Sequence, residues 1–173
     1  IETALKGTFY ESLIEDMFFG EASSYITCTE CGTSRTSHEK YLDIPLIVDG
    51  IKGVNESLEE YFRLEEIEGV NCEQCQKNTT QTKGPMLTRL PPVLTFNLVR
   101  IKYDMVTYDR IKINDKFEYP LELDMSKYLA PTEQAQAQKT EPDLVNYELK
   151  GIIIHRGGPY GGHYHAYIKD DYK

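Results

Sequence analysis

Hydrophobic residues along the chain mostly alternate with polar ones or occur in short runs, and only two segments show helical spacing. Residues 8–19 place Phe9, Leu13 and Met17 four positions apart, which predicts an amphipathic helix. A second short helix is predicted around the capping box Ser57-Leu58-Glu59-Glu60. The pattern therefore predicts a mainly β protein with a few short helices.

The remaining patterned segments are predicted strands. Alternation is clearest over residues 93–101, where apolar Leu94, Phe96 and Leu98 alternate with Thr95 and Asn97, as in a half-buried strand. In contrast, residues 131–142 are polar, with an Ala-Gln-Ala-Gln centre, and predict a surface loop. The other predicted strands are residues 23–27, 33–48, 78–83, 110–113, 116–119, 147–155 and 162–169.

All four cysteines fall into two Cys-x-x-Cys pairs, Cys28 with Cys31 and Cys72 with Cys75. Two thiolates on each of two tight turns complete a tetrahedral Zn²⁺ site, and four sulfur ligands leave no position for water or substrate. The alternatives are disulfides, inert thiols or a redox pair, since a bridge across a two-residue gap is the strained kind found in redox catalysts. We predict a structural zinc ion that clamps the tips of a thin projecting arm, and no cysteine free to act as a nucleophile.

Composition and charge narrow the range of partners. Counting 19 Lys+Arg against 28 Asp+Glu gives a net charge of −9, and no run of basic residues is present, so nucleic acid is not an expected partner. Apolar runs such as residues 151–154 are far shorter than the roughly 20 residues that span a bilayer, so no membrane partner is expected. Zinc-binding thiols require a reducing compartment, which predicts a cytoplasmic and/or nuclear location.

The start of the chain and its histidines carry further information. Ile1-Glu2-Thr3-Ala4 has neither an initiator Met nor a signal-peptide pattern, so we expect the interior of a longer chain. Gly161-Gly162 precedes His163, and an imidazole on a strand beside a glycine-rich loop can act as a general base. A plain hairpin histidine and a metal site remain alternatives. The metal site would use His163 and His165 with a third ligand from His155, Asp170 or Asp171.

These motifs together resemble the ubiquitin-specific protease family, papain-like cysteine hydrolases that cut ubiquitin from its conjugates. The most specific match is the family's histidine box, YELKGIIIHRG at 147–157 followed by GGHYHAY at 161–167. The cysteine pairs match the region called the fingers. Residues 111–120 are most similar to the branch that contains the herpesvirus-associated member. Further matches, in the family's order, are residues 41–46, 90–94 and 98–101.

The resemblance implies an α+β fold: a mostly antiparallel β palm with a zinc-clamped β fingers arm and a few short helices, part of a papain-like cysteine peptidase fold. Residues 1–173 would belong to one catalytic domain. Residues 1–24 would form a helix and the palm entry, 25–83 the zinc-binding fingers, and 84–173 the palm with the histidine box. The thumb with the nucleophile, and the Asp or Asn that orients the histidine, are expected outside this chain, which alone should be inactive.

The resemblance also assigns roles to individual residues. His163 would deprotonate the catalytic cysteine, and the thiolate would attack the carbonyl of ubiquitin's last glycine. Gly161, Gly162 and Tyr164 would line the slot for the ubiquitin tail, beside a movable loop at residues 156–160. Arg100 would contact substrate, although Ile101 stands where the family usually has an aromatic residue. No role is assigned to His165, and Cys28, Cys31, Cys72 and Cys75 would hold the finger tips that grip ubiquitin.

The implied function is thiol-dependent hydrolysis of the bond after the C-terminal glycine of ubiquitin, with ubiquitin, ubiquitinated proteins and the missing thumb as partners. One alternative is a non-catalytic ubiquitin-binding scaffold that keeps the structural zinc site. Another is a zinc-ribbon interaction module unrelated to ubiquitin, which explains the cysteines and leaves the histidine box without a role. The only cofactor expected is the structural zinc ion.

Overall fold

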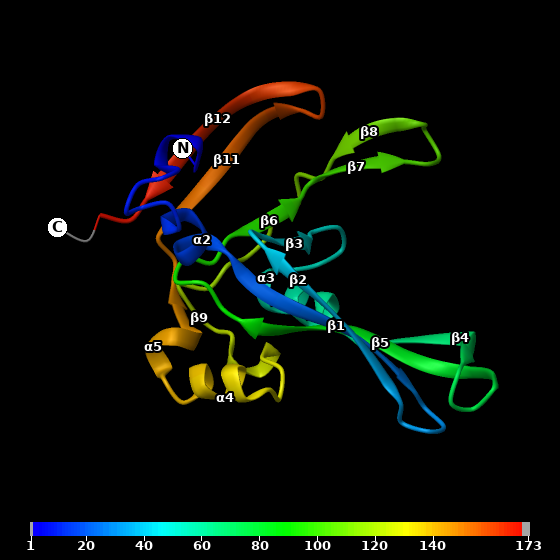
Figure 1. The fold of residues 1–173 in the computed structure, drawn as a ribbon. Coiled ribbons are helices and arrows are strands. Elements are labelled where there is room, and N and C mark those ends of the chain that lie inside the picture. The colour runs from blue at the N-terminus through cyan, green and yellow to red at the C-terminus, as the bar shows by residue number, and fades with distance from the viewer. Residues whose placement is uncertain (1, 171–173) are drawn as a thin grey trace.

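The computed structural model describes residues 2–170, and its α+β fold is dominated by antiparallel strands. A long four-stranded sheet projects as an arm from a base that holds several short helices, and two-stranded hairpins extend from that base in another direction (Figure 1). The helices are α1 (Glu2–Leu5), α2 (Leu13–Phe18), α3 (Val54–Tyr61), η1 (Ser126–Tyr128), α4 (Glu133–Lys139) and α5 (Pro142–Val145). The strands are β1 (Gly20–Cys28), β2 (Ser34–Tyr41), β3 (Ile44–Ile47), β4 (Glu65–Cys72), β5 (Lys77–Arg89), β6 (Phe96–Val99), β7 (Ile101–Asp104), β8 (Asp109–Lys112), β9 (Glu122–Asp124), β10 (Asn146–Glu148), β11 (Gly151–Gly158) and β12 (Gly161–Ile168).

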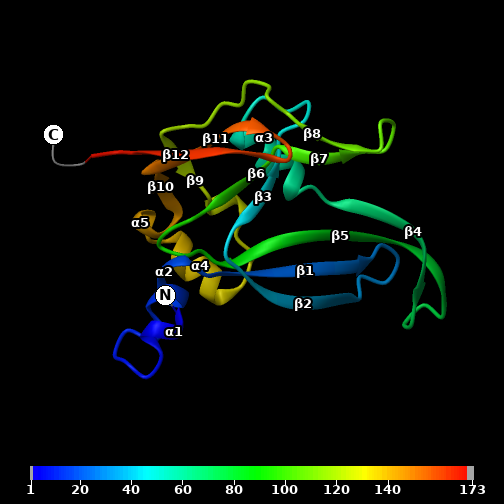
Figure 2. The ribbon, with the colours of Figure 1, turned by 90° about the horizontal axis from the view of Figure 1, so that it is seen from above.

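The arm is the sheet β2-β1-β5-β4, in which every neighbouring pair is antiparallel. Its two outer connections, β1–β2 and β4–β5, are the two cysteine turns, and they lie together at the far end (Figure 2). Most side chains of β2 and β4 are exposed, so the sheet has little apolar core of its own. This arrangement confirms the predicted thin arm.

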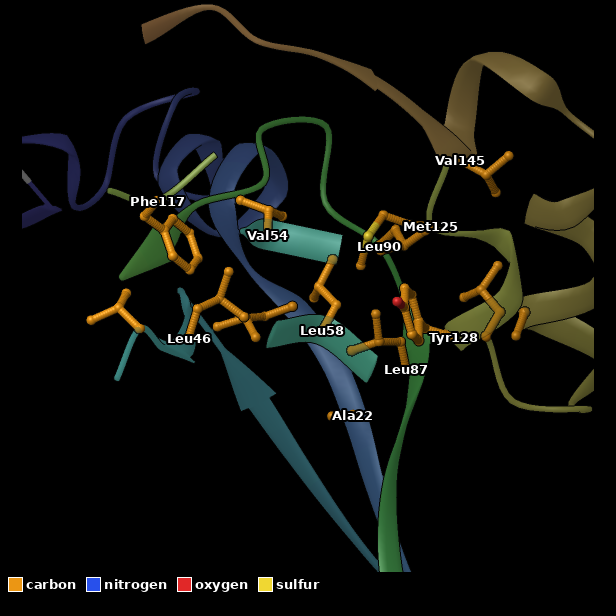
Figure 3. Close-up of a cluster of buried hydrophobic side chains, with 14 of the residues drawn as sticks. Ala22, Leu46, Val54, Leu58, Leu87, Leu90, Phe117, Met125, Tyr128 and Val145 are labelled. Carbon is orange, nitrogen blue, oxygen red and sulfur yellow. The ribbon is translucent and has the colours of Figure 1, made fainter. Parts of the chain in front are cut away.

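The hydrophobic core lies at the base of the arm, where α3 packs against the parallel pair β3 and β6 (Figure 3). Leu46 from β3 and Leu58 from α3 are fully buried, and Met125 lies between them and the region of α4 and α5. Ser57 donates a hydrogen bond to Ile47 O at 2.8 Å, which joins the same helix and strand. The short helix predicted around Leu58 is therefore confirmed.

Two predictions about helix ends were wrong. Ser57 does not cap α3, because the helix begins three residues earlier with Gly53 as its N-cap and Ser57 lies inside it. Residues 8–19 form a helix only from Leu13 to Phe18, and none of its side chains is buried. Phe9 is 94% exposed, so the spacing that predicted a longer amphipathic helix has no apolar surface to pack against in this chain.

The polar segment at residues 131–142 is not a loop but contains α4 and the start of α5. Thr132 caps α4 by accepting a hydrogen bond from Ala135 N at 3.3 Å, and Ala135 is fully buried. Alanine and glutamine are good helix formers, but the polar composition of the segment predicted a loop. The helix buries only one face, so its sequence contains few apolar residues.

Four predicted strands also differ from the structure. Residues 93–101 form β6 only from Phe96 to Val99, and Ile101 already begins β7. Residues 33–48 form two strands, β2 and β3, and residues 147–155 span β10 and the first part of β11. At residues 116–119 there is only an isolated bridge between Glu118 and Gly53. Within residues 2–170, no helix is long and apolar enough to cross a bilayer.

Candidate active-site hairpin and cysteine cluster

The histidine box from Gly151 onward forms one antiparallel hairpin, β11–β12, closed by a turn at Pro159 and Tyr160. His163 lies opposite Arg156, and its side chain is exposed. The pairing fixes which side chains share a face, because residues directly opposite each other point the same way and successive residues alternate. The predicted pair of strands is thus confirmed, but β11 runs from Gly151 to Gly158, so only Pro159 and Tyr160 form the turn.

His163 and Tyr164, both predicted site residues, lie on opposite faces of this hairpin. Tyr164 faces His155, and the two rings stack with centroids 4.6 Å apart. His165 shares the face of His163, while His155 does not, so the three histidines cannot converge on one metal ion. Among residues 2–170 only the four cysteines form a possible metal-binding group, and Asp171 lies outside the described residues.

The two glycines before His163 have different surroundings, although the sequence assigns them one role. A Cβ on Gly162 would lie 2.2 Å from Arg156 O and 2.3 Å from His155 Nε2, which leaves no room for a side chain. A Cβ on Gly161 would meet no atom within 4 Å. Gly162 is therefore required by close packing against His155, whereas Gly161 stands in open space.

A second hairpin, β7–β8, lies beside the histidine hairpin. Lys112 Nζ donates hydrogen bonds to the carbonyl oxygens of His155 (2.8 Å) and Gly157 (2.9 Å). At the turn, the Tyr160 hydroxyl donates to the Asp109 carboxylate. The proximity of these two hairpins could not be read from the sequence, because the contacts join residues more than 40 positions apart.

The side chain of Arg100, predicted to bind substrate, contacts other residues of this chain. Its guanidinium donates to the carbonyl oxygens of Ile113 (3.1 Å) and Asp115 (3.0 Å) and lies 5.9 Å from the centre of the Phe117 ring. These contacts hold the segment that follows β8 against the end of β6. Ile101 next to it is 39% exposed. The role of Arg100 toward substrate stays a prediction.

The four cysteines converge at the tip of the arm, as predicted. Their sulfur atoms all lie within 4.8 Å of one another, with Cys28 Sγ 3.9 Å from Cys75 Sγ and Cys31 Sγ 3.6 Å from Cys72 Sγ. Four sulfurs at ~2.3 Å from a tetrahedral Zn²⁺ would be about 3.8 Å apart, so the spacing fits that ion. No disulfide is formed.

Hydrogen bonds around the cluster shift the pKa values of its cysteines in different directions. The Thr79 hydroxyl, with the Cys31 main-chain N–H, lowers the pKa of Cys28 to about 6, and the Thr33 hydroxyl lowers the pKa of Cys31. The pKa of Cys75 is raised to about 12, chiefly because its thiol donates toward Cys31. Neighbouring thiolates repel one another, so full ionisation of this cluster calls for a cation at its centre.

Thr79 is a residue that the sequence prediction missed. The sequence predicts only a strand at residues 78–83, yet Thr79 is 4% exposed and lies 3.4 Å from Cys28 Sγ. Thr79 shares a face of β5 with Gln81, the register partner of Cys28, and this register is visible only in the structure. Such a neighbour orients a metal-binding thiolate and supports its charge.

A family model described as ubiquitin carboxyl-terminal hydrolase matches residues 2–173. The chain belongs to this family. Ubiquitin C-terminal hydrolase 12 of Arabidopsis thaliana is 36% identical over 98% of this chain, and ubiquitin carboxyl-terminal hydrolase 5 of Schizosaccharomyces pombe is 35% identical over 99%. The chain spans about 15% of the length of each of these relatives.

Solved structures share the fold. The SAGA Ubp8/Sgf11/Sus1/Sgf73 DUB module bound to ubiquitin aldehyde contains a chain that aligns with 92% of this one at a TM-score of 0.79 and 28% identity. The alignment covers 35% of that neighbour's chain. The α+β fold with mostly antiparallel sheets is therefore that of a ubiquitin-specific protease.

Proposed function

We propose that this chain is the fingers and palm of a deubiquitinase, which hydrolyses the bond after the C-terminal glycine of ubiquitin through a cysteine nucleophile supplied by the thumb. The observation that carries the proposal is the exposed imidazole of His163 on a glycine-flanked hairpin, in a chain of the ubiquitin carboxyl-terminal hydrolase family. The relatives are named hydrolases, which favours an enzyme over a non-catalytic scaffold.

In this proposal His163 is the general base. Its exposed imidazole accepts the thiol proton of the thumb cysteine, and the resulting thiolate attacks the glycine carbonyl. His163 then returns the proton to the leaving amine, and water hydrolyses the thioester in a second step. An Asp or Asn from outside residues 1–173 orients the imidazole. This chain alone holds one of the three groups and is inactive.

The slot for the ubiquitin tail would run along the same hairpin. Gly161 and Gly162 expose main chain beside His163, and a narrow passage of this kind admits only a tail without bulky side chains. Tyr164, 66% exposed on the opposite face, would border the slot from there, and residues 156–160, the end of β11 and the hairpin turn, would move aside. Arg100, which directly follows β6, would contact the substrate. Ubiquitin and ubiquitinated proteins are the proposed partners.

The experiment uses the complete protein with a fluorogenic ubiquitin substrate. His163→Ala is expected to abolish hydrolysis while ubiquitin binding, measured by calorimetry, stays within about twofold. His165→Gln is the matched control, since it changes the neighbouring histidine on the same face and is expected to keep hydrolysis. An inactive wild-type protein, or a fully active His163→Ala variant, would refute the proposal.

The cysteine cluster is proposed to hold one structural zinc ion through Cys28, Cys31, Cys72 and Cys75. The tetrahedral sulfur spacing and the closed, four-thiolate ligand set support a structural ion rather than a catalytic one. Metal analysis is expected to give one zinc per chain. A chelator should increase hydrogen exchange at the tip of the arm before it affects α3. Absence of zinc after purification without chelators would refute this assignment.

Three finer assignments follow. The segment at residues 111–120 supports a place in the branch of the herpesvirus-associated member, which alignment of the complete sequence would test. Residues 1–24, 25–83 and 84–173 would be the palm entry, fingers and palm of one catalytic domain.

The reduced thiols support a cytoplasmic and/or nuclear location. Imaging the tagged complete protein would decide the compartment.

A further inference from the structure

The hairpin that carries His163 is attached to the rest of the described structure by few contacts. β11 and β12 form a two-stranded sheet that pairs with no other strand among residues 2–170. At its base, Leu149 N donates to Leu121 O at 2.9 Å. Two-stranded sheets are only marginally stable in water, so the far end of the hairpin, where His163 lies, needs support from elsewhere.

Two residues of β8 give that support: Asp109 accepts from the Tyr160 hydroxyl at the turn, and Lys112 binds the main chain nearer to His163. In Figures 1 and 2 the outer part of the β11–β12 hairpin lies beside β8. The Lys112 ammonium donates to the carbonyl oxygens of His155 and Gly157, at 2.8 and 2.9 Å. These carbonyls flank Arg156, and Arg156 is the residue paired with His163 in the hairpin. The ammonium therefore holds the main chain directly opposite the proposed base.

We propose that Lys112 is a positioning residue for His163. The inference rests on the proposed function, and it assigns Lys112 no contact with substrate. A general base must sit within about 0.5 Å of its working position, and a displacement of about 1 Å can cost about 100-fold in rate. Lys112 acts through β11, because it fixes the strand to which His163 is paired.

The chemistry of the contact suits lysine. An ammonium has three donors and no acceptor, and hydrogen bonds from a charged donor are stronger than neutral ones. Within the described residues the Lys112 ammonium forms no ion pair with a carboxylate. Its two hydrogen-bond acceptors are the carbonyl oxygens of His155 and Gly157. Alternate carbonyls of a strand point to one edge, which is why a single ammonium reaches both. A methionine of similar length would leave them without a donor.

The kinetic test uses the complete protein and a fluorogenic ubiquitin substrate. Lys112→Met is expected to lower kcat at least about 10-fold with KM within about twofold, and Lys112→Arg, which restores a charged donor, is expected to recover most of the loss. Lys102→Met is the matched control, because Lys102 lies on the same β7–β8 hairpin and pairs with Asp49 instead. A Lys112→Met variant with unchanged kcat, or with a loss confined to KM, would overturn the proposal.

A second measurement does not depend on activity. Hydrogen exchange followed by mass spectrometry on the complete protein should be at least about 10-fold faster across residues 154–164 in Lys112→Met, and unchanged there in Lys102→Met. If exchange rises and wild-type protein hydrolyses nothing, the proposed function fails while the anchoring by Lys112 stands. If exchange is unchanged, Lys112 does not hold the hairpin and the inference is refuted.

Discussion

Gln138 pairs with the main chain of Leu90 through both ends of its side-chain amide, accepting from Leu90 N at 3.0 Å and donating to Leu90 O at 3.1 Å. This two-point contact joins α4 to the end of β5, and Leu90 is 3% exposed. The side chain therefore takes the place of a neighbouring strand for one residue, since it satisfies a donor and an acceptor that would otherwise be buried unpaired.

Removal of this amide should destabilise the chain. Gln138→Ala is expected to lower the free energy of unfolding by about 1–3 kcal/mol, because two main-chain groups of Leu90 lose their partner. Urea denaturation followed by circular dichroism measures the change. Gln134→Ala is the control: Gln134 is exposed on the same helix, and its replacement should have an effect within about 0.5 kcal/mol. Equal losses in the two variants would contradict this account.

The glycine pair before His163 offers a sharper contrast. Gly162→Ala would place a Cβ 2.2 Å from Arg156 O and 2.3 Å from His155 Nε2, so the hairpin must separate or His155 must leave its stack on Tyr164. We expect a loss of about 1–3 kcal/mol, as for overpacking elsewhere. Gly161→Ala, with no atom within 4 Å of the new Cβ, should be nearly neutral.

Thermal unfolding of the two variants measures that difference. Chemical shifts of the His155 ring should change in Gly162→Ala and stay as in wild type in Gly161→Ala. If both glycines tolerate alanine equally, the packing of Gly162 against His155 does not restrict the hairpin.

Thr79 should strengthen metal binding. Its hydroxyl is the main cause of the lowered pKa of Cys28, so Thr79→Val removes the donor, raises that pKa and weakens the thiolate as a ligand. Zinc affinity, measured by competition with a chromophoric chelator, is expected to fall about 10–100-fold. Thr80→Val is the control, since Thr80 lies on the next, more exposed position of β5. Unchanged affinity in Thr79→Val would show that the hydroxyl does not support Cys28.

Local chemistry in the sequence was sufficient to predict the cysteine cluster and the histidine hairpin. Each depends on spacing: Cys-x-x-Cys fixes two thiols on one turn, and two strands around a glycine-rich turn fix a hairpin. Contacts between distant segments were not predictable in the same way. Lys112 and Gln138 both bind main-chain carbonyls, which every residue has, so no side-chain pattern marks their partners.

Predictions from hydrophobic spacing failed where the apolar face had nothing to cover it. Phe9 and Leu13 repeat with helical spacing, yet both are exposed and the helix is short. The reverse failure occurred at residues 131–142, where a polar composition predicted a loop. There Ala135 is fully buried, Gln138 binds Leu90 and Thr132 caps the helix, so these contacts stabilise a helix that composition did not indicate.

The tip of the β7–β8 hairpin depends on Asp104. Its carboxylate accepts hydrogen bonds from the Thr107 hydroxyl (2.7 Å) and from the main-chain N–H groups of Val106 (3.2 Å) and Thr107 (3.3 Å). These donors, the Thr107 hydroxyl first, lower the pKa of Asp104 below its ordinary value. The three contacts order a turn whose apolar side chains, Met105 and Val106, are 71% and 85% exposed.

The lowered pKa of Asp104 predicts how the order of this turn changes with pH. The carboxylate supports the turn fully above the ordinary aspartate pKa of about 3.9, and this support is lost as the pH falls through the lower folded value. The amide resonances of Val106 and Thr107 should therefore move with a midpoint below pH 3.9. Thr107→Val removes the main donor and should shift the midpoint upward, whereas Asp104→Asn should abolish the transition. A midpoint that stays the same in Thr107→Val would mean that the hydroxyl does not stabilise the ionised carboxylate.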